Sequence, residues 1–528
     1  MKVLPYAHPV LSCQQAKDLE FSVLTDASAE WSAMQQAGAG IAKSVIEDYQ
    51  ELRSVPEHLR ILALIGKGNN GGDALLACGQ LLADYPRAQV DLILTSPADE
   101  LRPLAARALQ ELEGRVQIRQ ISEACGLSEI SQMLVELGGE IGFHICIDGL
   151  LGMSFVPPLR APVCDLIEAI NAFEGIELRA SVDLPSGAGD GVEPDALILR
   201  ADFSYATGIA KKPLFAGWGT CGRVRYVDLG FFKTTPGQVV EAEEAILTDA
   251  VLAPLRRLRP ANVDKRSFGH LFIVGGSARM PGALLMSVRA AVSSGVGLVT
   301  AFAPSSVTAV LAAQVPEAMW ISWPETSLGT LSPSGMSLIL ERIDQATAVI
   351  AGPGFGADAS TEMVAQEIVK LVECPLLLDA DALRVSVLEP VRMRQEAYGR
   401  VVLTPHMGEF MRVAKLEEPD YTNDVLLDFS KSHGVVTVLK GPQTRICNGA
   451  SVIYHTQGGP VLARGGSGDL LTGLIGGMLA QNAHREEEAV AQGLYLHGLA
   501  AQCLARVHGQ VSVHTTQLLD YLSAVLRT

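Results

Sequence analysis

Short apolar runs alternate with longer helical patterns in both halves of the chain. In the first half the apolar runs lie at 61–65, 90–95, 144–148 and 178–183, and stretches such as 73–83 have helical periodicity. The second half repeats the pattern, with apolar runs at 271–274, 348–351, 376–379, 401–404 and 435–439. Buried strands separated by helices are typical of βαβ units around a parallel sheet. The pattern therefore predicts two successive α/β domains.

The length of the chain agrees with two domains, because 528 residues exceed what one ordinary core accommodates. Turn residues and a charged stretch with no strong sheet signal separate the two halves, which predicts a boundary within 235–248. We expect domains at 1–237 and 245–528. The most apolar stretch, 284–302, contains Arg289 and several small residues, so it predicts a buried helix leading into a strand.

The composition of the chain limits the classes of partner that it can bind. A net charge of −17 argues against nucleic acid or an anionic membrane, so we expect small-molecule ligands. The nine cysteines include no C-x-x-C pair, which indicates neither a zinc site nor a disulfide framework and favours a reducing cytosol. The first residues lack the continuous apolar core of a signal peptide. We expect a cytoplasmic protein that forms a homo-oligomer.

A glycine-rich segment near the C-terminus is the clearest chemical signal. The run GGSGD comprises Gly465, Gly466, Ser467, Gly468 and Asp469, and an apolar helical pattern follows it. Glycines let a backbone approach a phosphate, and the N–H groups and dipole of a helix start attract its charge. A carboxylate is useful there if it takes a proton from a hydroxyl that attacks the phosphate. The alternative is a glycine-rich turn in which Asp469 only caps the helix.

The first half offers three polar loops at expected strand ends. GKGNNGGD follows the run 61–65, Asp148 closes the run 144–148, and Asp183 closes the run 178–183 ahead of Ser186. Ligands collect at the carboxyl ends of strands in open α/β sheets, so the three loops predict one polar pocket. Its oxygen donors suit a hard cation better than zinc. The alternative is that Asp148 and Asp183 only cap turns.

Taken together, these motifs resemble a known pair of domains. NNGGD (69–73), IDGLLG (147–152) and DLPSG (183–187) resemble NAD(P)H-hydrate epimerase. The second half resembles the ADP- or ATP-dependent NAD(P)H-hydrate dehydratase of the ribokinase-like superfamily, through GGS (275–277), GPGFG (352–356), DADAL (379–383), TPHMGE (404–409), LKG (439–441) and GGSGD (465–469). The order is that of bifunctional nicotinamide nucleotide repair enzymes. The resemblance implies an N-terminal Rossmann-like three-layer domain followed by a C-terminal ribokinase-like α/β/α domain.

The resemblance also implies a two-step repair of hydrated NADH and NADPH. The first domain would interconvert the R and S epimers of NAD(P)HX as an isomerase. The second would dehydrate the S epimer to NAD(P)H as a lyase, with consumption of a phosphoryl group from ADP or ATP in the presence of Mg²⁺. In this scheme Asp469 deprotonates the hydrate's hydroxyl for attack on the nucleotide, and the GGSGD amides stabilise the transferring charge.

Site residues in the second domain follow from the same resemblance. Ala283, Gly356, His406 and Asp469 are implied to contact the hydrate, and Glu409 is expected to help organise magnesium. The residues implied to contact the nucleotide are Lys440, Gly441, Pro442, Gln443, Thr444, Gly465, Gly466, Ser467 and Gly468.

In the first domain the resemblance implies a potassium ion held by Asn70, Asp148 and Ser186. Asp148 is then the expected acid/base residue, with the cation keeping it ionised. The residues implied to contact the hydrate are Asn69, Asn70, Gly71, Gly72, Asp73, Gly152, Met153, Ser154, Phe155, Val156, Pro157, Pro158 and Asp183.

Some positions depart from the family pattern. Ala74, Met153 and Ser154 stand where smaller or different residues are usual, and their side chains either narrow the substrate pocket or have no effect on it. Arg464 either contacts a phosphate or is a solvated surface charge. A small-molecule kinase acting on a vitamin alcohol, with a non-catalytic first domain, is the alternative function.

Overall fold

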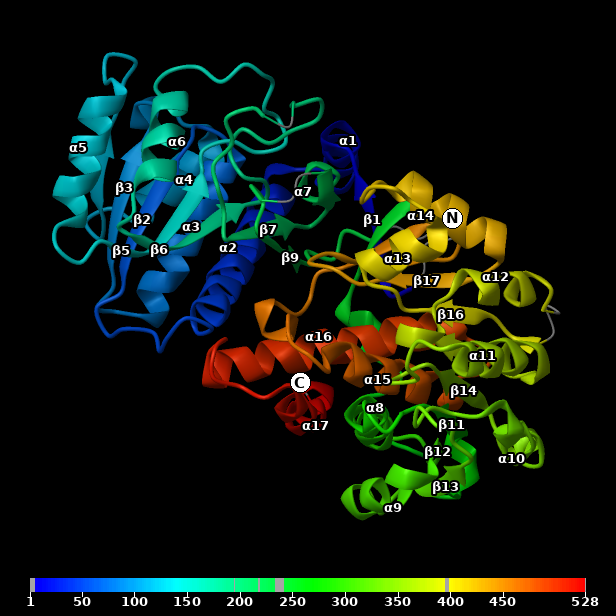
Figure 1. Ribbon diagram of the computed structural model, residues 1–528. Helices are drawn as coiled ribbons and strands as arrows, with labels where there is room; N and C mark the ends of the chain where they lie inside the picture. Colours follow the sequence, from blue (N-terminus) through cyan, green and yellow to red (C-terminus); the bar gives the residue numbers. More distant parts are fainter. Residues whose placement is uncertain (1–4, 194, 217–218, 233–241, 395–397, 528) are drawn as a thin grey trace. The chain divides into compact units, whose positions relative to one another are not determined.

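The computed structural model describes residues 5–193, 195–216, 219–232, 242–394 and 398–527. The chain divides into two compact units, His8–Ala242 and Met1–Ala7 with Glu243–Thr528. Both units place helices around a mostly parallel sheet (Figure 1), which confirms the predicted α/β class. Among the described helices, none combines the length and the apolar character that crossing a bilayer requires. That residues 1–237 and 245–528 form the two functional domains stays a prediction.

The N-terminal unit is built on a seven-stranded sheet in the order β4-β3-β2-β5-β6-β7-β9, and all neighbouring strands are parallel. The chain leaves β2 in one direction and β5 in the other, so a topological switch point lies between these two strands. The strands are β2 (Arg60–Ile65), β3 (Gln89–Leu94), β4 (Gln117–Gln120), β5 (Phe143–Gly149), β6 (Ile176–Val182), β7 (Phe203–Thr207) and β9 (Arg223–Val227).

Helices cover both faces of this sheet, which gives the expected three layers. Ile61, Ala63 and Ile65 of β2 join the core under α2 (Ala27–Tyr49), α3 (Asn69–Asp84) and α4 (Pro103–Gln110). Leu62 and Leu64 join the opposite core under α5 (Leu127–Gly138) and α6 (Val163–Ala172). This division reflects the alternation of side chains along a strand whose two faces are both buried.

Two further strands of this unit form a short parallel pair outside the seven-stranded sheet. β1 (Ala7–Leu11) pairs with β8 (Ala210–Lys211), with Leu11 opposite Lys211. α1 (Cys13–Val23) follows β1, and a capping box between Ser12 and Gln15 fixes its start. α7 (Pro213–Ala216) follows β8.

The C-terminal unit has the strand order β13-β12-β11-β14-β15-β16-β17-β18-β19-β10. Neighbours are parallel from β13 to β17, β18 is antiparallel to both of its neighbours, and β10 is parallel to β19. A second switch point lies between β11 and β14. The strands are β10 (Glu244–Leu247), β11 (His270–Val274), β12 (Leu298–Pro304), β13 (Met319–Trp323), β14 (Ala348–Ala351), β15 (Leu376–Leu378), β16 (Val401–Leu403), β17 (Val436–Leu439), β18 (Thr444–Cys447) and β19 (Val452–His455).

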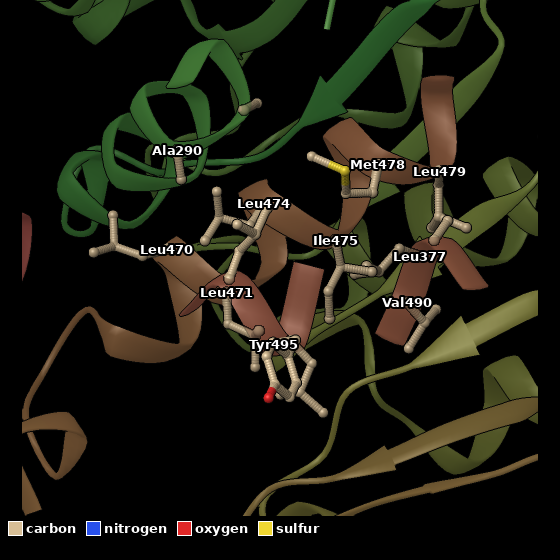
Figure 2. Packing of buried hydrophobic residues seen from close by; sticks show 14 of the residues in the cluster. Ala290, Leu377, Leu470, Leu471, Leu474, Ile475, Met478, Leu479, Val490 and Tyr495 are labelled. Atoms are coloured by element: carbon tan, nitrogen blue, oxygen red, sulfur yellow. The ribbon is translucent and has the colours of Figure 1, made fainter. Parts of the chain in front are cut away.

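The most apolar helix of this unit, α15 (Ser467–Gln481), is enclosed on several sides. Leu474, Ile475 and Met478 lie in one core cluster with residues of α8 (Pro281–Ser293), α16 (Glu486–His508) and the sheet (Figure 2). Burial of a Leu or Ile side chain contributes about 1.5–3 kcal/mol, so the position of α15 is firmly fixed. The remaining helices are α9 (Ser305–Gln314), α10 (Met336–Leu340), α11 (Ala359–Leu371), α12 (Val385–Arg392), α13 (Met407–Ala414), α14 (Asn423–His433) and α17 (Leu522–Arg527).

The predicted strands are confirmed to within one or two residues at each end, and 284–302 forms most of α8 followed by the start of β12. The segment between the halves contains one strand, β10, for which the sequence has no strong signal. Positions 235–241 of the predicted boundary lie outside the described residues.

Candidate active sites

A cavity of about 910 Å³ opens at the switch point of the N-terminal sheet. Its walls come from the loops that follow β2 and β5, from Asp183 after β6 and from Thr207 at the end of β7. The three loops that the sequence singled out therefore meet in one place, as expected for the carboxyl ends of parallel strands. Cavities of this size accommodate a nucleotide-sized ligand.

The NNGGD motif forms the first turn of α3 beside this cavity. Asn69, Asn70 and Asp73 line the cavity, whereas Gly71 and Gly72 are buried behind them. A Cβ added at Gly71 would lie 2.1 Å from the backbone oxygen of Gly66, so only glycine lets the helix start this close to β2. The Asn70 amide nitrogen donates to the Leu151 carbonyl at 2.8 Å, which joins the NNGGD turn to the loop after β5.

The loop after β5 supplies a second wall. The cavity is lined by Gly152, Met153, Ser154, Phe155, Val156 and Pro158, and Pro157 is absent from its lining. Met153 also packs against the small core formed by Leu11, Ala16, Ile209 and Phe231.

Asp148 and Ser186 lie beneath the cavity rather than on its surface. Asp148 is 1% exposed, and its carboxylate accepts hydrogen bonds from the Ser186 hydroxyl (2.5 Å), the Ser186 N–H (2.8 Å), the Ser181 hydroxyl (3.0 Å) and the Leu150 N–H (3.2 Å). Burial raises the pKa of Asp148, and these hydrogen bonds oppose the rise. Among the described residues, no basic side chain is paired with this carboxylate.

Asp183 occupies a different setting, at the cavity wall. Its backbone has φ of 63°, a left-handed conformation that is unusual for a residue other than glycine. Its carboxylate accepts a hydrogen bond from the Thr207 hydroxyl at 3.4 Å and forms an ion pair with the fully buried Lys211. Glu20 of α1 and Asp73 of α3 line the same cavity, so three carboxyl groups lie in its wall.

In the C-terminal unit, loops from neighbouring strand ends also converge. Gly352–Gly356 follows β14, Asp379 follows β15, His406 lies three residues after β16, and Lys440 directly follows β17. The backbone N–H of Gly356 donates to the Asp381 carboxylate at 2.9 Å. His406 forms an isolated parallel β-bridge with Lys440, so these loops lie side by side.

The GGSGD segment forms the N-terminus of α15 at this site. Gly466 is the N-cap residue and has φ of 88°. A Cβ added at Gly468 would lie 3.4 Å from the Lys440 ammonium, so this lysine reaches the glycine-rich turn. Free N–H groups at a helix start together with an ammonium group form a site for a phosphate. The buried His497 lies 3.4 Å from the Ser467 hydroxyl, and burial lowers the pKa of His497 to about 4, which keeps it neutral.

Asp469 lies in the first turn of α15, partly exposed, as the sequence suggested. Burial raises its pKa to about 6, the charge of Asp379 adds to the rise, and Lys440 opposes it. Lys440 is itself held by Asp379 at 2.9 Å, and the Thr472 hydroxyl donates to the other oxygen of Asp379 at 2.6 Å. A carboxyl group with a pKa near neutrality beside a phosphate site is suited to accept a proton during catalysis.

The other predicted residues surround this centre. A Cβ added at Gly354 would lie 3.2 Å from the Cβ of Ala283, so Ala283 is next to the Gly352–Gly356 loop. His406 caps α13, and Glu409 accepts from the His406 N–H at 2.8 Å and lies 3.9 Å from the Lys440 ammonium. In residues 440–444 the Thr444 hydroxyl donates to the Gly441 carbonyl at 3.0 Å, which closes a tight turn before β18.

Comparisons with known proteins agree with this arrangement. Residues 31–212 match the family model of the YjeF-related protein N-terminus, and residues 271–524 match that of NAD(P)H-hydrate dehydratase. The chain is 30% identical to the bifunctional NAD(P)H-hydrate repair enzyme of Moorella thermoacetica, with 94% of this chain and 92% of the relative covered. The corresponding enzyme of Gloeobacter violaceus is also 30% identical, with 96% of each chain covered. The chain belongs to the family of bifunctional NAD(P)H-hydrate repair enzymes.

A solved structure of one domain is also similar. The ADP/ATP-dependent NAD(P)H-hydrate dehydratase from Bacillus subtilis, co-crystallized with ATP/Mg²⁺, is 29% identical in sequence to this chain. The match covers 51% of this chain and 92% of that chain, with a TM-score of 0.44.

The departures from the family pattern can now be located. Ala74 faces the core, since a Cβ added at Gly149 would lie 2.5 Å from the Ala74 Cβ, so Ala74 does not narrow the cavity. Met153 and Ser154 do line it. Arg464 is exposed, and its guanidinium donates to the carbonyls of Gln510, Val511 and Val513, which ties the segment before α15 to the loop after α16. Contact of Arg464 with a phosphate stays a prediction.

Some residues at the two sites had no sequence signal. Lys211 and Glu20 lie next to Asp183 only through tertiary packing, and neither belongs to a recognisable spacing pattern. The contact between Asp379 and Thr472 also had no sequence signal. Asp379 does belong to the DADAL motif, which could have indicated a role for it at the site.

Proposed function

We propose that this chain repairs hydrated NADH and NADPH: the N-terminal unit interconverts the R and S epimers, and the C-terminal unit dehydrates the S epimer with ADP or ATP. The observation that carries the proposal is the position of Asp469, a half-buried carboxyl group in the first turn of a helix whose N-terminus also faces Lys440. Family membership over nearly the whole chain supports both activities.

In the C-terminal unit, hydroxide is a poor leaving group from the hydrate, whereas phosphate is a good one. Asp469 takes the proton of the hydrate's hydroxyl as that oxygen attacks the terminal phosphorus of the nucleotide. The N–H groups of Gly466–Gly468 and the Lys440 ammonium stabilise the charge on the transferred group. Elimination of phosphate from the ring then restores the reduced cofactor.

The residues around this centre bind the hydrate and the nucleotide. The hydrate contacts Ala283, Gly356 and His406, and the nucleotide contacts residues 440–444 together with 465–468. Within the described ranges, no three histidine, cysteine, aspartate or glutamate side chains are grouped to hold a metal ion. Glu409 would contribute a carboxylate to magnesium bound with the phosphates of the nucleotide, and the ion would neutralise phosphate charge.

In the N-terminal unit, the hydrate occupies the cavity against Asn69, Asn70, Asp73, residues 152–156, Pro158 and Asp183. Asn70, Asp148 and Ser186 hold a potassium ion. The residues fit such an ion, because all three offer oxygen atoms and the buried Asp148 carboxylate is not paired with a basic side chain in the described part of the chain. The ion supplies positive charge that fixes the loops after β2, β5 and β6.

A vitamin-alcohol kinase with a non-catalytic N-terminal domain is not favoured. The N-terminal unit has its own match to a family model and its own large cavity with acidic side chains in its wall. A kinase of this superfamily needs only the C-terminal unit.

The test uses the purified chain with pure R- or S-NADHX, with and without ADP or ATP, and follows the absorbance of NADH. Nucleotide-dependent formation of NADH from both epimers supports the proposal. Conversion of S alone would refute the epimerase, and phosphorylation of a vitamin alcohol without NADH formation would support the kinase.

We also propose a cytoplasmic location and a homo-oligomeric state. All nine cysteines are free thiols in the structure, which suits a reducing compartment. Fractionation of cells that express a tagged chain tests the location. Light scattering on the purified protein tests the oligomeric state, and a monomeric mass would contradict it.

A further inference from the structure

The acidic wall of the N-terminal cavity contains an ion pair that the proposed function does not use. Lys211 is 0% exposed and lies behind Asp183, where its ammonium contacts the Asp183 carboxylate and donates to the Thr207 carbonyl at 3.2 Å. The register of β1 against β8 holds Lys211 opposite Leu11. The backbone thus fixes the position of the lysine, and its ammonium contacts the cavity wall at Asp183.

The charge state of Lys211 follows from its neighbours. Burial lowers the pKa of Lys211, but the charges of Asp183 and Glu20 outweigh this and leave it raised. The lysine is therefore protonated. A buried ammonium in contact with one carboxylate stabilises that carboxylate as an anion, because little water screens the pair.

The other two carboxyl groups of this wall have raised pKa values. Burial raises the pKa of Asp73 well above its usual value, and the charges of Asp183 and Glu20 raise it further. Burial likewise raises the pKa of Glu20 to about 7. One cavity wall therefore combines an aspartate that is paired with a buried lysine and an aspartate whose pKa is raised by burial, and environments that differ in this way divide the roles of base and acid between two carboxyl groups.

Asp148 lies outside this cavity wall. It does not line the cavity, and both of its oxygens already accept hydrogen bonds from Ser181, Ser186 and Leu150. Its surroundings suit a residue that fixes loops or holds a cation. They do not suit a residue that exchanges protons with a ligand in the cavity.

We propose that Asp183, which is ion-paired with the buried Lys211, and Asp73, which lines the same cavity wall, are the base and acid of epimerisation in the N-terminal unit. Lys211 is then a positioning residue, because it acts through Asp183. The inference rests on the proposed epimerase function and assigns its proton transfers to these residues instead of Asp148.

The step balances without an added reagent. Asp73 gives its proton to the hydroxyl on the ring carbon next to nitrogen, the carbon–oxygen bond breaks, and water leaves while the nitrogen electron pair forms a C=N⁺ bond. Water then adds to the opposite face of that carbon, and its proton passes to Asp183. Exchange of a proton between the two carboxyl groups, directly or through water, restores the starting state.

The test measures conversion of R-NADHX to S-NADHX by full-length variants. We expect Asp183→Asn and Asp73→Asn to lower kcat for epimerisation ~100-fold or more, as is typical for loss of a general base or acid. Lys211→Met should lower the rate at neutral pH ~10-fold or more and shift the pH profile of kcat/KM to higher pH, because the positive charge in contact with the Asp183 carboxylate is then lost. A purely structural lysine would lower the rate without moving the profile.

Controls separate catalysis from folding. Lys212→Met changes the neighbouring exposed lysine and should leave epimerisation unchanged within about twofold. Dehydration of S-NADHX by the same preparations reports that the C-terminal unit is intact, and KM for the R epimer reports that the cavity still binds. The double variant Asp183→Asn with Lys211→Met should be close to Asp183→Asn alone, since Asp183 is the carboxylate that Lys211 contacts.

Several results would overturn the inference. They are near-normal epimerisation by Asp183→Asn or Asp73→Asn, an unshifted pH profile for Lys211→Met, or a double variant much slower than Asp183→Asn. Failure of the unmodified chain to epimerise R-NADHX would instead refute the proposed function itself.

Discussion

The two units place polar loops at the same topological position but use it in different ways. In the N-terminal unit, the switch point between β2 and β5 opens into a cavity, and the carboxylates Asp148 and Asp183 are almost fully buried. In the C-terminal unit, the chemistry lies at the start of α15, where Asp469 is partly exposed beside backbone N–H groups. Parallel sheets thus support either an enclosed acid site or an anion site at a helix start, depending on the loops.

The difference has a chemical reason. A reaction that only moves protons and water benefits from carboxyl groups whose charge states are set by burial and by a neighbouring ion pair. A phosphoryl transfer benefits from N–H donors and an ammonium group, with one base close by. The predictions below test whether the two sites are as separate as this comparison requires.

The largest effect is expected at Asp469. Asp469→Asn keeps the shape of the site but removes the base, so kcat for dehydration of S-NADHX should fall ~100-fold or more while nucleotide binding persists. Single-turnover kinetics measure the rate of dehydration, and nucleotide titration measures binding of ADP or ATP. The exposed Glu417→Gln in the same unit serves as the control, and near-normal turnover by Asp469→Asn would contradict the assignment.

A smaller effect is expected at Asp148. Asp148→Asn leaves an amide among groups that all donate hydrogen bonds to the carboxylate, so it should destabilise the N-terminal unit by about 1–3 kcal/mol and weaken any response to potassium. Epimerisation should fall as the loops lose their geometry, and dehydration of the S epimer should continue. Collapse of both activities would show that the sites are coupled.

The pH dependence of dehydration sharpens the comparison further. Because burial raises the pKa of Asp469 to about 6, the base is protonated below that pH, and kcat/KM for the S epimer should fall about tenfold per pH unit there and level off above it. Lys440 opposes the rise, so Lys440→Met should move the midpoint upward. A profile that is flat between pH 5 and about 7 would argue against Asp469 as the base.

Adjacent glycines provide the smallest and most local test. Gly466→Ala should destabilise the C-terminal unit by about 1–3 kcal/mol, because φ is 88° and the added Cβ would lie 2.3 Å from the Met286 sulfur. Gly465→Ala adds its Cβ to open space and should have little effect on stability. Chemical unfolding of both variants measures the difference, and equal stabilities would mean that the turn before α15 is not constrained as described.

Much of this architecture was predictable because buried parallel strands read as continuous apolar runs, as in β14 and β15. The glycine motifs also marked their strand ends, since close approach of backbone restricts the residue type. β10 escaped prediction because it is short, follows a charged stretch and pairs with β19, which lies far along the chain. Lys211 escaped because its burial depends on β1, which lies about 200 residues earlier in the chain.

The separation of two reactions in one chain is tested most directly by mixing two single variants. Asp183→Asn retains the C-terminal site, and Asp469→Asn retains the N-terminal site. Neither variant alone should convert R-NADHX to NADH faster than spontaneous epimerisation allows, but an equimolar mixture supplied with ADP or ATP should restore rapid conversion. A mixture that is no faster than its components would contradict the account, as would either variant that converts the R epimer efficiently by itself.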